Sequence, residues 1–199
     1  AVLGVSSYSS AYEVACRKRG LLPDLEASER MRWGHLHEQA CRNEVERESG
    51  WRVEYPGAYA VVRSDEHPHM IASLDGIVHH PDRGPGALEI KTREWCPDAE
   101  VMDTASSPRS MWDVQHHHQM TVIGVDWGVL GVLVGGCRFR WMVVERDDEL
   151  CKRIIATERE FWEALERGEM PQPDGSDATA RALKALHRFF AEPEQRSDD

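Results

Sequence analysis

Two short segments of this chain, 73–78 and 87–92, have the character of strands and flank a turn rich in proline and glycine. Side chains of a strand point alternately to its two faces, so Glu89 and Lys91 point the same way and the residue between them points into the core. The turn folds the second segment back beside the first and brings Asp75 next to Glu89. The sequence therefore predicts a hairpin on which two carboxylates and one ammonium group converge.

Two carboxylates this close repel each other unless a cation lies between them. Hard oxygen ligands of this kind suit Mg²⁺ or Mn²⁺. With Leu74 in place of the usual proline, the pattern resembles the active-site motif of the PD-(D/E)xK nucleases. The motif alone is loose, because charged residues make up 30% of the chain. The alternative interpretation is a solvated hairpin with a surface salt bridge, which would contribute little to stability.

The composition is that of a globular protein. The chain has 199 residues, 41% of them hydrophobic, which is enough for one domain with a buried core. No apolar run approaches the roughly 20 residues that span a bilayer, so no membrane association is expected. The net charge of −11 argues mildly against nucleic acid as a partner, although a local basic track is compatible with it. The five cysteines form no C-x2-C pair, which predicts no zinc ribbon and no disulfide framework and favours a reducing cytoplasm.

Serine caps and glycine stops mark the expected helices, and runs of β-branched residues mark the expected strands. The helices are 10–19, 28–49, one from Ser110 or Asp113 to 123, 147–167 and 178–190; the strands lie within 51–63, 70–79, 87–92, 129–134 and 139–144. This order predicts an α/β domain with a mixed central β-sheet flanked by helices. The nuclease-like domain is expected to span 1–170, with a linker, a short helix and an acidic tail in 171–199. The start at Ala1 falls within an element, which predicts native residues upstream.

Four further segments accompany the hairpin. They are 4–8 with 17–21, Arg32–Glu38, Met111–Gly124, and Phe161-Trp162 with Gly168 and Pro171. In the second of them a glycine precedes the glutamate by four residues, one helical turn away on the same face. In this order and spacing the blocks resemble the YqaJ-type viral recombinase family, phage lambda exonuclease-like members of the PD-(D/E)xK superfamily. The resemblance extends over roughly residues 1–178.

The resemblance implies a restriction-endonuclease-like core and a DNA exonuclease of the alkaline exonuclease type. Such enzymes depend on Mg²⁺, with Mn²⁺ as a substitute and two ions in the site, and contain neither zinc nor an iron–sulfur cluster. They resect linear duplex DNA from free ends, typically 5′ to 3′, in phage-type recombination. The resemblance also implies a single-strand annealing protein as partner, a homotrimer as assembly, and a phage or prophage origin in a bacterial cytoplasm. The alternatives are a structure-specific endonuclease of the same fold and a non-catalytic DNA-binding or assembly module.

The resemblance assigns roles to individual residues. The metal ligands are Asp75, Glu89, the backbone carbonyl of Ile90 and, near the second metal position, Glu38; the other catalytic residues are Lys91 and Gln115. The second position of the family's Q-x-Q helix is occupied by His117, a departure from the pattern. Ser73, Arg93 and His117 are the candidate DNA contacts. The upstream Arg and Ser with which the family binds a terminal 5′-phosphate lie before Ala1 or match nothing in this chain, so the polarity of cleavage is an open question.

Three other patterns in the sequence support their functional interpretations less well than the nuclease interpretation is supported. The segment 37–41 contains His-Glu but ends in cysteine, so it lacks the second histidine of a zincin H-E-x-x-H motif. Successive helical residues point about 100° apart, so the three histidines of 116–118 cannot bind one zinc ion together. A base-stacking role for Trp33 or Trp95 is a weaker hypothesis than a role in packing.

Overall fold

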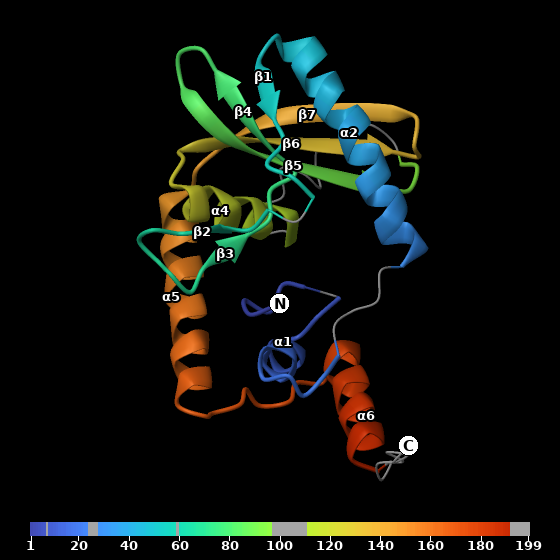
Figure 1. The fold of residues 1–199 in the computed structure, drawn as a ribbon, viewed down its shortest axis with the longest axis vertical. Coiled ribbons are helices and arrows are strands. Elements are labelled where there is room, and N and C mark those ends of the chain that lie inside the picture. The colour runs from blue at the N-terminus through green and yellow to red at the C-terminus, as the bar shows by residue number, and fades with distance from the viewer. Residues whose placement is uncertain (7, 24–27, 59, 97–110, 192–199) are drawn as a thin grey trace, which may run out of the picture. The chain divides into compact units, whose positions relative to one another are not determined.

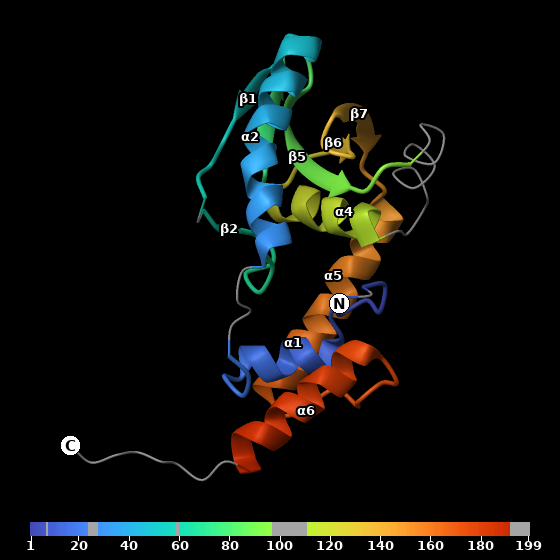
Figure 2. The same cartoon turned by 90° about the vertical axis from the view of Figure 1, so that its right-hand side faces the viewer.

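A computed structural model of the protein describes residues 1–6, 8–23, 28–58, 60–96 and 111–191. The chain divides by packing into two compact units, residues 27–156 and residues 1–26 with 157–199. Figures 1 and 2 show the elements of both units. The hairpin with its carboxylates lies in the unit 27–156. These units are defined by how densely the chain packs and do not test the expected nuclease domain of 1–170. That domain stays a prediction. The expected acidic tail lies outside the described residues from 192 on.

A five-stranded mixed sheet forms the centre of the unit 27–156, as the sequence predicts. Its strands, in spatial order, are β1 (Arg52–Glu54), β4 (Gly76–His80), β5 (Gly84–Arg93), β6 (Trp127–Val134) and β7 (Arg138–Glu145). β5 and β6 run parallel, and every other neighbouring pair is antiparallel. A parallel pair needs a crossover connection, and helix α4 (Met111–Ile123) lies in that connection.

Two helices cover opposite faces of this sheet. On one face, Cys41 and Val45 of α2 (Glu29–Ser49) pack against Ile90, which is 6% exposed. On the other face, Met120 of α4 packs against Ala87. Because side chains alternate along β5, the two charged residues of the motif share the α4 face with Ala87. The expectation that Ile90 points into the core is confirmed.

The helix boundaries follow local chemistry. The hydroxyl of Ser28 accepts the N–H of Met31 at 3.2 Å and caps α2, and Gly50, with φ of 71°, ends it. Gly124, with φ of 67°, ends α4. Glycine adopts the left-handed conformation that ends a helix at little cost in free energy, so the local sequence encodes both helix ends. The polar, proline-containing sequence of 95–110 favours a loop or short helix near the site, and from residue 97 on this segment lies outside the described residues.

The predicted strand 70–79 is broken in the structure. Its first part is β3 (Ile71–Ala72), which pairs with β2 (Val62–Arg63) in a separate two-stranded sheet. Its second part is β4, and Asp75 lies in the break between them. The strands expected around the Pro56-Gly57 turn form as β1 and β2 but do not pair with each other. Strand partners depend on packing against distant residues, which the local sequence does not show.

In the other unit, α1 (Ala11–Lys18) packs against α6 (Asp177–Ala191), with Cys16 and Ala182 in their shared core. The hydroxyl of Ser10 caps α1 by accepting the N–H of Glu13 at 3.1 Å, as predicted. It also accepts a hydrogen bond from the Thr179 hydroxyl of α6 at 2.7 Å. The boundary between the units falls within α5 (Asp148–Glu166). None of the helices in the described ranges is long and apolar enough to cross a membrane.

Candidate active site

The end of β4 brings Asp75 to the motif on β5. The two strands pair antiparallel with Gly76 opposite Leu88, so Asp75 comes to lie opposite Glu89. The pairing of β4 with β5 ends at Gly76 and Leu88, whereas β5 continues to Arg93. Oδ2 of Asp75 accepts the N–H of Ile90 at 2.7 Å and so replaces a strand partner. The N–H and C=O of one strand residue point to the same edge, so the Ile90 carbonyl also points to the side of Asp75.

Glu89 is buried among polar partners, with 2% of its surface exposed. Its Oε2 accepts a hydrogen bond from the Gln119 amide at 2.5 Å, and its Oε1 forms an ion pair with Lys91. Nζ of Lys91 also donates to Oε1 of Gln115 at 2.9 Å. Burying a carboxylate costs free energy unless it is paired and hydrogen-bonded, and Glu89 is both. This burial excludes the interpretation of the hairpin as a solvated surface feature.

Helix α4 holds the two glutamines against β5. Gln115 and Gln119 are four residues apart and therefore share one helical face. Between them, His116 is 1% exposed and donates from Nε2 to the Ala87 carbonyl at 3.2 Å. Burial lowers the pKa of His116, so its ring is neutral and its N–H is available to the carbonyl. The ring packs on the backbone of Gly128 in β6, which fixes α4 on the sheet.

The environment of Asp75 disfavours its charge. Burial and then the negative charge of Glu89 raise the pKa of Asp75 to about 7, with a smaller contribution from Glu38. The hydrogen bond from the Ile90 N–H and the charge of Lys91 act in the opposite direction. Two carboxylates are thus held together where like charges repel and water is scarce. A divalent cation between them would remove that repulsion.

Glu38 reaches the site through Arg42. The Glu38 carboxylate contacts His35 at 3.0 Å and Arg42 at 3.8 Å. Arg42 is 5% exposed and donates to the backbone carbonyl of Asp75 at 2.9 Å. Its guanidinium carbon lies 4.0 Å from the ring centroid of Tyr55. Arg42 thereby ties helix α2 to the short segment that carries Asp75.

The oxygen atoms suited to a metal ion are those of Asp75, Glu89 and the Ile90 carbonyl. The donor set of buried Glu89, half-buried Asp75 and a backbone carbonyl is of the kind that Mg²⁺ and Mn²⁺ take. Within the described ranges, no three His, Cys, Asp or Glu side chains gather as a metal cluster. Glu38 is accordingly not grouped with the pair, and its role as a ligand stays a prediction.

The three residues expected to contact DNA have different placements. Ser73 is exposed, and its carbonyl accepts a hydrogen bond from Gln119 at 3.2 Å, so it lies beside the site. Arg93 is the half-buried last residue of β5. The expectation that His117 faces the site is not met. It is 2% exposed and its Nδ1 contacts the Asp113 carbonyl at 2.9 Å, because two residues along a helix turn the side chain about 200° away from Gln115.

Sequence reasoning missed Gln119 and Arg42. Each lies four residues after a residue that was found, Gln115 in α4 and Glu38 in α2. The helical period therefore could have indicated both. The helical period does not show which side chains are buried. In the structure, buried Gln119 hydrogen-bonds to Glu89 and buried Arg42 hydrogen-bonds to the Asp75 backbone.

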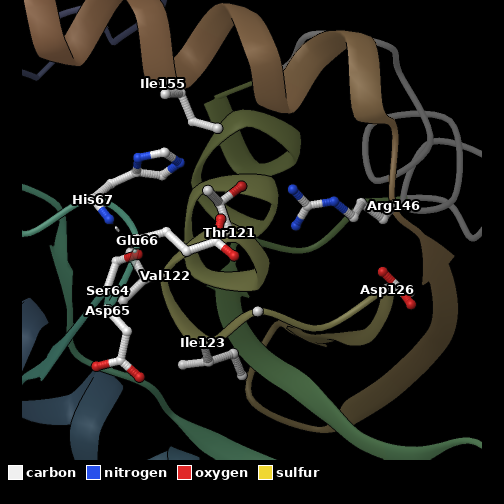
Figure 3. A pocket seen from close by; sticks show the side chains of 11 residues that line it. Ser64, Asp65, Glu66, His67, Thr121, Val122, Ile123, Asp126, Arg146 and Ile155 are labelled. Atoms are coloured by element: carbon white, nitrogen blue, oxygen red, sulfur yellow. Dashed lines mark hydrogen bonds between the residues drawn. The ribbon is translucent and has the colours of Figure 1, made fainter.

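A second polar region lies at the C-terminal end of α4 (Figure 3). It is a pocket of about 340 Å³ lined by Ser64, Asp65, Glu66, His67, Thr121, Val122, Ile123, Gly124, Asp126, Arg146 and Ile155. The lining contains none of the residues expected in the site. Its arginine already pairs with Asp148 at 3.0 Å.

Replacing Gln119 by leucine should destabilise the protein, because Glu89 would lose a buried hydrogen bond. We expect the free energy of unfolding to fall by about 1 to 3 kcal/mol. The matched control is Gln115→Leu, because Gln115 lies one turn away on the same face of α4 but is exposed. The free energy of unfolding of this variant should lie within about 0.5 kcal/mol of that of the unchanged protein. Urea unfolding in EDTA measures both. Equal stability of the two variants would contradict the role assigned to Gln119.

Comparisons with known proteins identify the relatives of this chain. The model of the YqaJ-like viral recombinase domain matches residues 1–126. The uncharacterized protein YqaJ of Bacillus subtilis is 31% identical over 203 residues, which cover 97% of this chain and 59% of that protein. The chain thus spans little more than half the length of this relative.

Solved structures share the fold. LHK-Exo, an alkaline exonuclease from Laribacter hongkongensis, superposes with a TM-score of 0.57 at 20% identity, covering 96% of this chain and 90% of that one. A phage-related exonuclease from Haemophilus somnus gives a TM-score of 0.57 at 13% identity, covering 79% and 81%. The fold is therefore the restriction-endonuclease-like core that the sequence predicts. With the family model matching well over half of its residues, the chain belongs to the YqaJ-like viral recombinase family.

Proposed function

We propose that this protein is a Mg²⁺-dependent deoxyribonuclease that removes nucleotides from the free ends of linear duplex DNA, 5′ to 3′. The observation that carries the proposal is the buried Glu89 opposite the half-buried Asp75, with Lys91 held beside them by Gln115. Family membership and the exonuclease fold support it, and one structure of this fold was solved in complex with dAMP. A module without catalysis would have no use for two repelling carboxylates under a helix.

In the proposed reaction, Asp75, Glu89 and the Ile90 carbonyl would hold the metal ion. When bound, Mg²⁺ polarises a phosphoryl oxygen and supplies a hydroxide at neutral pH. Lys91 places a positive charge beside the scissile phosphate and stabilises the charge that develops in the transition state. Gln115 fixes the direction of the Lys91 ammonium group, and Gln119 fixes Glu89.

Digestion of labelled DNA tests this function. Linear duplex DNA with a 5′ label on one strand and a 3′ label on the other is incubated with Mg²⁺ or EDTA, beside a closed circle. Mg²⁺-dependent loss of the 5′ label with the circle intact is the expected result. A nicked or linearised circle would instead identify a structure-specific endonuclease. No cleavage of either substrate would favour the non-catalytic DNA-binding or assembly module.

Metal binding should stabilise the folded protein. At a concentration of Mn²⁺ about 100-fold above its dissociation constant, linkage predicts about 2.7 kcal/mol, or a rise in Tm of roughly 5 to 10 °C. Asp75→Asn should remove most of this rise, whereas Asp82→Asn, an exposed acid in the turn of the same hairpin, should keep it. Thermal melts with and without Mn²⁺ measure the effect. An equal rise in both variants would place the metal elsewhere.

The assembly and partners remain part of the proposal. A homotrimer, a single-strand annealing protein as partner, and a phage or prophage origin in a bacterial cytoplasm rest on the family resemblance. Sedimentation of the purified protein tests the first of these, since a monomer at micromolar concentration would contradict it.

A further inference from the structure

A second pocket opens between the N-terminal half of α2 and the ends of β5 and β6. It has a volume of about 350 Å³ and is lined by Arg30, Trp33, Gly34, His37, Thr92, Arg93, Glu94, Leu133, Gly135 and Gly136. His37 directly precedes Glu38 in the chain, and Thr92 directly follows Lys91. Thr92 has the orientation of Ile90, so the pocket lies on the face of the sheet that α2 covers, whereas Glu89 and Lys91 point to the face that α4 covers.

Aromatic surface is exposed in this pocket. Trp33 keeps 50% of its surface exposed although it lies in a helix, and the ring of His37 lies one turn further along, with the two ring centroids 5.8 Å apart. The Arg32 guanidinium lies 5.9 Å from the Trp33 ring. The indole N–H of Trp33 donates to Glu29 at 2.9 Å, which fixes the ring while half of its surface stays exposed. An exposed and fixed aromatic ring is a surface on which a nucleobase stacks.

The charge of the lining differs from that of the whole chain. The chain carries 35 acidic and 24 basic residues, whereas the lining contains Arg30 and Arg93 against the single acid Glu94. A locally positive pocket in an acidic protein is complementary to a phosphodiester chain.

Gly34 supplies an independent observation. Glycine in the middle of a helix is unfavourable relative to alanine and usually has a packing reason. A methyl group built on Gly34 meets no described atom within 4 Å outside its own helix and chain neighbours. The protein therefore gains nothing in its own packing from this glycine, and the space it leaves is part of the pocket lining.

We propose that this pocket binds one unpaired nucleotide of single-stranded DNA, with the base stacked on Trp33 over the open backbone at Gly34 and the phosphates facing Arg30 and Arg93. The inference rests on the proposed nuclease function, because it names the form in which DNA lies beside that site. A strand that leaves its complement near the carboxylates has its bases exposed, and the pocket accepts one of them.

Binding of an eight-nucleotide thymidine strand, measured by fluorescence anisotropy in EDTA, tests the proposal without cleavage. Trp33→Leu should weaken binding about tenfold or more, and Trp33→Phe by less than about threefold, because only the aromatic ring provides a stacking face. Arg30→Gln should weaken binding and reduce its salt dependence, while Arg153→Gln, an exposed arginine of α5, should not. Gly34→Ala should weaken binding while raising Tm by roughly 2 to 4 °C.

Equal binding by Trp33→Leu and the unchanged protein would overturn the proposal. So would a lower Tm for Gly34→Ala, which would make this glycine a packing requirement. A change of molecular mass in Trp33→Leu would show that a second copy of the chain covers the pocket and would also overturn it. Binding that responds to these variants in a protein that does not digest DNA would refute the nuclease function alone.

Discussion

Asp75→Asn is expected to abolish Mg²⁺-dependent cleavage and leave the protein folded. Loss of one metal-binding carboxylate removes several kcal/mol of transition-state charge stabilisation, so cleavage should fall at least about a thousandfold. The fold should survive, because the asparagine oxygen can still accept the N–H of Ile90. In EDTA at pH 8 the variant should melt at the same or a higher temperature than the unchanged protein. A half-buried carboxylate facing Glu89 costs free energy that a neutral amide does not.

The two readouts separate catalysis from stability. Initial rates on end-labelled duplex DNA measure the first, and differential scanning calorimetry in EDTA measures the second. Asp82→Asn, in the turn of the same hairpin, should match the unchanged protein in both. Normal cleavage by Asp75→Asn would refute the assignment of the site. A much lower Tm would show that the carboxylate has a structural role.

Gly128→Ala should be among the most destabilising single-methyl changes in this chain. A methyl group at this position would lie 2.6 Å from the Ala87 carbonyl oxygen of the paired strand, 2.8 Å from Cε1 of the His116 ring and closer still to its Nε2. Neither the sheet backbone nor a buried ring can move away freely, so we expect a loss of about 3 kcal/mol and a fall in Tm of about 6 to 12 °C. Displacement of His116 would also tilt α4 and draw Gln115 and Gln119 away from β5, so cleavage should fall as well.

Gly175→Ala is the matched control for this prediction. Its added methyl group meets no described atom within 4 Å, and its backbone needs no left-handed conformation, so Tm should hardly change. Thermal melts in EDTA and cleavage at a temperature well below both transitions measure the two effects. A Gly128→Ala protein as stable as the control would show that His116 does not anchor α4 on β6.

Local patterns predicted most of the elements and the hairpin. Ser28 and Gly50 bound α2 as expected, and the turn after β4 places Asp75 opposite Glu89. These features depend on neighbours in the chain, through caps, left-handed glycines and the two-residue period of a strand. The break of strand 70–79 at Asp75 was not predicted, because it results from the pairing of β3 with β2.

The sequence by itself determined which chemical groups this protein brings to its hairpin: an aspartate, a glutamate and a lysine at spacings that force convergence, and glutamines on one helix. Only the tertiary structure decided what surrounds them. It buries Glu89 under Gln119 and ties Arg42 to the Asp75 backbone. The physical reason is that burial and partner choice arise from contacts between residues 30 or more positions apart, and no local period encodes such contacts.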